Sequence, residues 1–80
     1  MKQVFLADMG EVVYRGYRSL DDNPWSNFYL LVFKGKKSRR IGYFDSVSLM
    51  SRFVWEVSWN EGDIESVVRE WMASGKICRS

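Results

Sequence analysis

The fold is decided at residues 39–57, which read RRIGYFDSVSLMSRFVWEV. Up to Phe44 the pattern is typical of a β-strand, whose side chains alternate between two faces. From Val47 onward the apolar residues recur every three or four positions, as on one face of an α-helix. Asp45 and Ser46 lie between the two patterns, where either side chain can accept a hydrogen bond from the first helical turn. We therefore expect strands before this junction and helices after it.

Four strands are expected before the junction, arranged as two hairpins. The first pair is rich in Val, Phe and Tyr and flanks the turn Asp8-Met9-Gly10. The second pair flanks a lysine-rich turn that contains Gly35. Residues 19–27, between the hairpins, gather Asp, Asn and the only proline, so they are expected to form a surface loop that carries Trp25. The expected strands are residues 2–7, 11–18, 28–33 and 39–44.

Two helices are expected after the junction, separated by a break at Asn60-Glu61-Gly62. Asp63 is placed to cap the second helix, and Gly75 followed by Ile77 has the pattern of a left-handed helix end with a hydrophobic contact. The order β-β-β-β-α-α predicts an α+β fold, with a four-stranded antiparallel sheet and both C-terminal helices packed on one face. The apolar stripes of the helices are Val47, Met50, Phe53, Val54 and Val57, then Ile64, Val67, Val68, Trp71 and Met72.

Size and composition predict one small domain over residues 1–80 that folds by itself. Apolar residues make up 46% of the chain and charged residues 28%, which is the balance of a globule rather than of a disordered tail. No segment has the length of a membrane span, and we expect no signal peptide at the N-terminus. Cys78 is the only cysteine, which favours a reducing compartment. A cytoplasmic location is therefore expected.

The residue types argue against an enzyme. The chain has no histidine, which removes the usual general base and the usual metal ligand. Its glycines do not have the spacing of a phosphate-binding loop. The paired carboxylates Asp21-Asp22 and Glu61/Asp63 fit turn and cap chemistry. We expect no catalytic residue, no metal site and no cofactor.

The strand at residues 28–33 is apolar on both faces, although only one face of the sheet can be covered by the helices. Phe28, Leu30 and Val32 are expected to face inward, as are Val12 and Tyr14 on the second strand. On the fourth strand we expect Ile41 and Tyr43 to face inward, and Arg40, Gly42 and Phe44 outward. The outer face would then present Arg15, Tyr17, Tyr29, Leu31, Phe33 and Arg40. Aromatic and arginine side chains of this kind are typical of interface hot spots, but the Trp25 loop or the N-terminus could also cover this face.

The basic hairpin and the tryptophans leave alternatives open. A lysine-rich turn can keep a sheet edge soluble, or it can contact an acidic protein surface or phosphate. Trp71 is expected in the core and Trp55 and Trp59 half exposed, whereas Trp25 is either a lid on the core or an anchor for a partner. The candidate partner-binding residues are Arg15, Tyr17, Trp25, Tyr29, Phe33, Lys36, Lys37, Arg39 and Arg40.

A resemblance adds a class of partner. Phe44-Asp45-Ser46, then Leu49, Ser51 and Phe53, and then a glycine loop into Asp63-Ile64-Glu65 resemble a family of small phage-encoded anti-CRISPR proteins that inhibit type I surveillance complexes (Cascade). The similarity extends to chain length and to the order of strands and helices. The tyrosines that make contacts in that family have no clear counterpart here, so no binding residue is carried over.

The resemblance implies an inhibitor that binds a backbone protein subunit of the complex and blocks hybridisation of target DNA. It also implies a location in the cytoplasm of the host bacterial cell. We expect a monomer that binds neither a membrane nor nucleic acid directly. One alternative is a nucleic-acid-binding domain, in which the aromatic residues stack on bases and the basic hairpin holds phosphates. Another is an adaptor that forms a homodimer through the outer face.

Overall fold

A computed structural model of the chain describes residues 2–19 and 27–78. It contains a sheet and two helices in the predicted order β-β-β-β-α-α, followed by one further short strand. The elements are β1 (Gln3–Asp8), β2 (Val12–Arg18), β3 (Phe28–Lys34), β4 (Lys37–Phe44), α1 (Val47–Trp59), α2 (Ile64–Ala73) and β5 (Ile77–Cys78).

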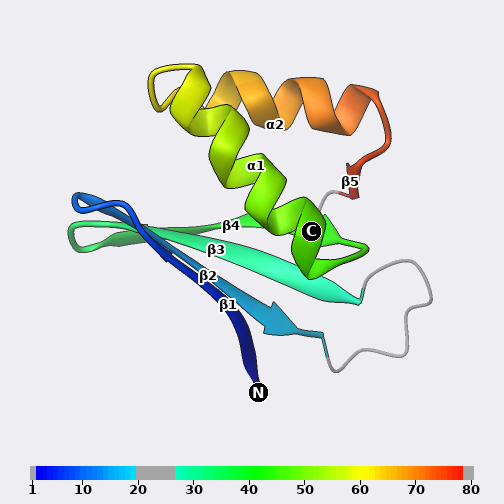
Figure 1. Ribbon diagram of the computed structural model, residues 1–80, viewed down its shortest axis with the longest axis horizontal. Coiled ribbons are helices and arrows are strands. Elements are labelled where there is room, and N and C mark those ends of the chain that lie inside the picture. Colours follow the sequence, from blue (N-terminus) through cyan, green and yellow to red (C-terminus); the bar gives the residue numbers. More distant parts are fainter. Residues whose placement is uncertain (1, 20–26, 79–80) are drawn as a thin grey trace.

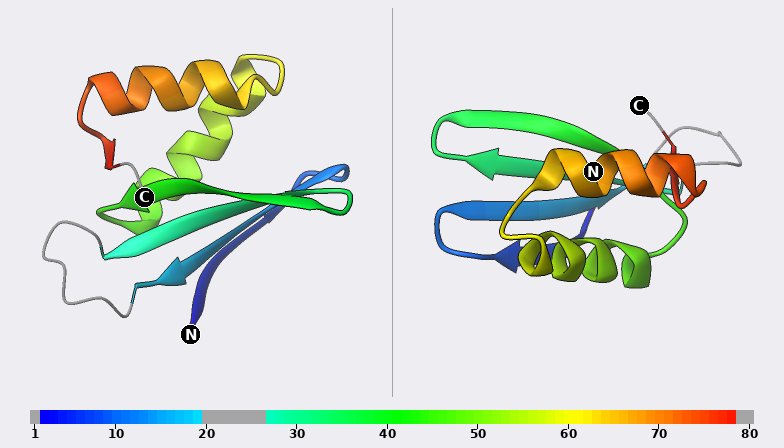
Figure 2. Two further views of the ribbon diagram at one scale, coloured as in Figure 1. Left: turned by 180° about the vertical axis from the view of Figure 1, so that it is seen from behind. Right: turned by 90° about the horizontal axis from the view of Figure 1, so that it is seen from above.

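The sheet is antiparallel throughout, with the strand order β1-β2-β3-β4-β5. Both helices lie on the same side of it, as Figure 1 shows. Seen from above, α1 lies on the side of β1 and β2 (Figure 2). The predicted α+β fold is therefore confirmed. β5 was not predicted; it pairs with the end of β4 through Tyr43↔Cys78 and Phe44↔Ile77.

The helix ends form where the sequence indicates them. Ser46, rather than Asp45, caps α1, and its hydroxyl accepts a hydrogen bond of 3.2 Å from the backbone N–H of Leu49. Asp63 caps α2 by accepting one of 3.1 Å from Ser66 N. After α2, Gly75 has a φ of +73°, which a residue with a Cβ rarely adopts. This turn directs the chain back towards the sheet, where β5 can pair with β4.

The core lies between the helices and the inner face of the sheet. Three aromatic rings pack at its centre, with centroids 5.6 Å apart for Phe44 and Phe53, 6.0 Å for Phe44 and Trp71, and 5.4 Å for Phe53 and Trp71. The indole N–H of Trp71 donates a hydrogen bond to the carboxylate of Glu56, which satisfies its polar group. Tyr14 lies at the sheet side of this core, and burial raises the pKa of its phenol. The remaining core residues are apolar and include Leu30, Val32, Ile41, Met50, Val54, Val57, Val67, Val68 and Ile77.

A β-bulge in β4 corrects the predicted orientation of its last residues. Leu30 pairs with Gly42 and Leu31 with Arg40, so Ile41 is an extra residue without its own partner on β3. One inserted residue reverses the alternation that follows it. Ile41 faces the core as predicted, but the predictions for Gly42, Tyr43 and Phe44 were wrong. Gly42 pairs with the inward residue Leu30, Phe44 is 1% exposed in the core, and Tyr43 pairs with Tyr29 on the outer face.

Candidate functional site: the outer face of the sheet

The face of the sheet that the helices leave uncovered carries a mixed aromatic and basic surface. Strand pairing arranges its side chains in rows that run across the strands, because directly paired residues point to the same face. We call this surface the outer face. Its rows are Tyr17, Tyr29 and Tyr43; then Arg15, Leu31 and Arg40; and then Val13, Phe33 and Ser38.

The tyrosine row forms one packed cluster with Arg40. The rings of Tyr17 and Tyr29 stack with centroids 5.5 Å apart, and Tyr29 meets Tyr43 edge to face at 6.3 Å. The guanidinium carbon of Arg40 lies 4.6 Å from the centroid of Tyr29 and 5.9 Å from that of Tyr43. Arg40 also donates a hydrogen bond of 3.3 Å to the hydroxyl of Tyr43. These contacts hold the arginine in a fixed position over two rings, where cation–π attraction stabilises it.

Burial within the cluster is uneven, which decides what each residue can offer to a partner. Tyr29 is only 5% exposed, Tyr17 and Tyr43 are half-buried, and Arg40 is exposed. Tyr29 therefore lies beneath the cluster, whereas the accessible surface is formed by Arg40 and the outer edges of Tyr17 and Tyr43. Tyr29 remains a candidate, in the role of holding Arg40 and Tyr17 in place.

A second cation lies beside the cluster on the same face. The guanidinium carbon of Arg15 is 5.6 Å from the centroid of Phe33, and the Arg15 side chain is exposed while Phe33 is half-buried. Arg15 and Arg40 both pair with Leu31, one from each side. The outer face thus presents two arginines around an apolar centre, an arrangement that suits a partner with apolar groups and carboxylates.

The predicted basic cluster is divided by the structure. Lys36 and Lys37 are exposed at the tip of the β3–β4 hairpin. Arg39 pairs with Val32, whose side chain is in the core, so it lies on the helix side, and there it forms an ion pair with Glu65 of α2. Arg39 therefore does not share a surface with Arg40. Trp25 lies outside the described residues.

Tyr43 is the outer-face residue that sequence reasoning missed. A strict alternation from Arg39 to Phe44 places it inside, next to the core. The available signal was Gly42, because an isolated glycine within a strand pattern indicates a bulge. Gly42 also lies close to β5. A Cβ at this position would be 2.7 Å from the carbonyl oxygen of Cys78, which is too close for any residue other than glycine.

Within residues 2–19 and 27–78, no group of three or more Cys, Asp or Glu side chains is placed to hold a metal ion. None of the helices in this part of the chain is long and apolar enough to cross a membrane. No protein-family model, curated protein or solved structure matches the sequence or the fold of the chain.

Proposed function

We propose that this chain is an inhibitor that acts by binding a protein surface through its outer face. The observation that carries the proposal is the cluster of Arg40 with Tyr17, Tyr29 and Tyr43. Tyrosine and arginine are the residue types that dominate binding energy at protein interfaces. The strands and the cation–π contacts fix these side chains before binding, so less conformational entropy is lost when a partner docks.

The proposed partner is a backbone protein subunit of a type I CRISPR surveillance complex. This step rests on the resemblance around residues 44–65, which implies a blocker that docks its sheet on that subunit. Two features of the chain are consistent with it: the order of four strands and two helices, and a sheet face that those helices do not cover. A chain that covers the subunit surface where target DNA hybridises would block the complex without any catalytic step. The site of action would be the cytoplasm of the host bacterium.

Direct binding of nucleic acid fits the outer face less well. Single-stranded bases need an open aromatic ring face on which to stack. One face of Tyr29 is stacked against Tyr17, and Arg40 lies over its ring, so the most central ring on the outer face is occupied. Arg39 is bound to Glu65 instead of being free for phosphate.

The purified chain should therefore bind the protein complex but not naked nucleic acid. We expect no micromolar gel shift with single- or double-stranded DNA or RNA at about 150 mM salt, a condition in which non-specific binders have dissociation constants of roughly 10⁻⁴ to 10⁻⁶ M. Under the same conditions the chain should bind an immobilised type I surveillance complex in biolayer interferometry.

The salt dependence separates the two readings. If the chain bound phosphates, the logarithm of the association constant would fall with the logarithm of the salt concentration, with a slope of about 0.7 to 0.9 per phosphate neutralised. One outcome would replace the protein-binding proposal with the nucleic-acid one. It is tight, salt-sensitive binding to naked nucleic acid that is lost when Lys36, Lys37 and Arg40 are changed to glutamate.

A further inference from the structure

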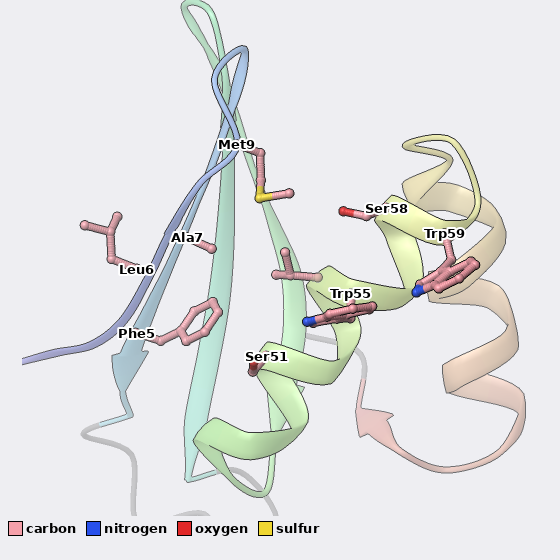
Figure 3. Close-up of a pocket in the computed structure, with 9 residues that line it drawn as sticks. Phe5, Leu6, Ala7, Met9, Ser51, Trp55, Ser58 and Trp59 are labelled. Carbon is pink, nitrogen blue, oxygen red and sulfur yellow. The ribbon is translucent and has the colours of Figure 1, made fainter.

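An apolar groove lies between β1 and α1, on the opposite side of the sheet from the outer face. Its volume is about 660 Å³. Figure 3 shows Phe5, Ala7 and Met9 directed towards α1, and Leu6 directed the opposite way. Among the described residues, four large apolar side chains are exposed, and all four line this groove. They are Leu6 (55% exposed), Met9 (52%), Trp55 (63%) and Trp59 (75%).

The groove opens along the free edge of β1. β1 is the last strand of the sheet, and on its outer side no described strand pairs with it. In the β1–β2 hairpin the backbone N–H of Met9 donates a hydrogen bond to the carbonyl oxygen of Val12. Hydrogen-bonded pairs in an antiparallel hairpin occur at every second position, so the next ones are Ala7↔Tyr14 and Phe5↔Gly16. Leu6 and Asp8 therefore direct their backbone N–H and C=O groups away from β2. An apolar edge strand of this kind is a template for pairing with another strand.

We propose that a second copy of this chain occupies this edge, by antiparallel pairing of the two β1 strands about a two-fold axis at Leu6. Each strand would then supply the backbone groups that the other lacks. The two sheets would become one continuous sheet, and the two α1 helices would lie on the same side of it. A two-fold axis uses the same residues twice, so the strand must be complementary to itself.

The sequence of β1 meets that requirement in this register. Phe5 of each copy lies opposite the partner's Ala7, so a large side chain meets a small one on the inner side, beneath the tryptophans of α1. Leu6 lies opposite the partner's Leu6 on the outer side, where each is otherwise exposed. Lys2 comes within two positions of the partner's Asp8, which places opposite charges at both ends of the strand pair.

The exposed tryptophans supply a large part of the apolar area that a dimer interface needs. A tryptophan side chain carries roughly 150–250 Å². Trp55 and Trp59 expose 63% and 75% of theirs, so the four tryptophans of two copies offer on the order of 500 Å². Leu6, Met9 and the paired backbone of both copies add to this, towards the roughly 1,200–2,000 Å² of a stable interface. Trp55 and Trp59 already stack, with centroids 6.2 Å apart, so little side-chain freedom remains to be lost.

This dimer departs from the monomer expected from the sequence, and its interface does not use the tyrosine cluster of the outer face. With the two-fold axis perpendicular to the sheet, both outer faces point to the same side. If the proposed function holds, the dimer presents two outer faces to the partner complex, which strengthens binding through avidity. The dimer itself does not depend on that function.

Sedimentation equilibrium of the full chain tests the dimer. We expect a concentration-dependent mass that approaches twice the 9.5 kDa of one chain. Leu6→Lys should give a folded monomer, because it places two like charges opposite each other at the axis. Val13→Lys, the matched change on the outer side of β2, should leave the dimer intact. Trp55→Ala combined with Trp59→Ala should raise the dimer dissociation constant by about 10- to 1000-fold, with an unchanged circular dichroism spectrum.

A cross-linking experiment fixes the register. In a Cys78→Ser background, which removes the native exposed thiol, Leu6→Cys should form a covalent dimer on oxidation and Val13→Cys should not. A chain that is monomeric at all concentrations overturns the proposal and leaves the groove to a different partner. A dimer that persists in Leu6→Lys, or that is lost instead in Tyr17→Ala, also overturns it and points to the outer face. Since none of these measurements uses a CRISPR complex, they remain decisive if the proposed function fails.

Discussion

Replacing Trp71 with alanine is expected to unfold the domain at room temperature. Trp71 is fully buried and its ring packs against Phe44 and Phe53. Truncating a buried tryptophan costs about 3–5 kcal/mol, from lost burial and from the cavity left behind. A domain of this size has roughly 3–5 kcal/mol or less of net stability. The truncation also removes the hydrogen bond that Glu56 receives from the indole.

Two variants serve as controls in urea unfolding followed by circular dichroism. Trp71→Phe keeps a six-membered aromatic ring but loses the second ring of the indole and its N–H, so it should remain folded with a lower midpoint. Trp55→Ala removes the same side chain from an exposed position on α1, and at concentrations where the chain is monomeric it should lose far less stability. A Trp71→Ala variant that unfolds at nearly the wild-type urea concentration would show that this aromatic cluster is not the centre of the core.

The second large effect is expected at Arg40. Arg40→Ala should weaken binding to the proposed partner, a type I surveillance complex, by about 2–4 kcal/mol, the range of an interface hot spot, while leaving the fold intact. Arg40 is exposed on the outer face, and its guanidinium is held over Tyr29 and Tyr43. Tyr29→Ala is a less specific test, because Tyr29 is 5% exposed and its loss would disturb the packing of the whole cluster.

Arg69→Ala is the matched control. Arg69 is an exposed arginine on α2, on the helix side of the molecule, and it changes the net charge by the same amount. It should leave affinity within about twofold of the wild type, since a distant surface charge mainly tunes the association rate. Equal losses in both variants, measured by biolayer interferometry with thermal melts as a check on folding, would mean that net charge and not the outer face determines binding.

The helix positions could be predicted from sequence because their signals are local. Ser46 and Asp63 act through hydrogen bonds to backbone groups three residues away, and Gly75 acts through its own φ. The pairing of β2 with β3 has no register shift, so both strands keep strict alternation, and the inward positions of Tyr14, Leu30 and Val32 were predicted correctly.

The remaining differences arise from contacts between distant residues. The bulge at Ile41 depends on β4 pairing with β3 on one side and with β5 on the other, and β5 is too short to show a period of its own. Strict alternation therefore misplaced Tyr43, which completes the tyrosine row. The groove beside β1 was missed for a similar reason. Trp55 and Trp59 were predicted to be half exposed and are 63% and 75% exposed, but only the crossing of α1 over the sheet brings them next to Leu6 and Met9.

The most direct test of the central claim is a titration of target-DNA hybridisation by a purified type I surveillance complex. A blocker that acts only by binding should reduce hybridisation linearly with each addition of the chain, and inhibition should be complete at a fixed ratio of chain to backbone subunit. DNA that is added before the chain should protect the complex. The predicted result is this stoichiometric endpoint, displaced to higher concentration by Arg40→Ala but not by Arg69→Ala. Full hybridisation in the presence of excess folded chain, or inhibition by far less than one chain per complex, would contradict the claim.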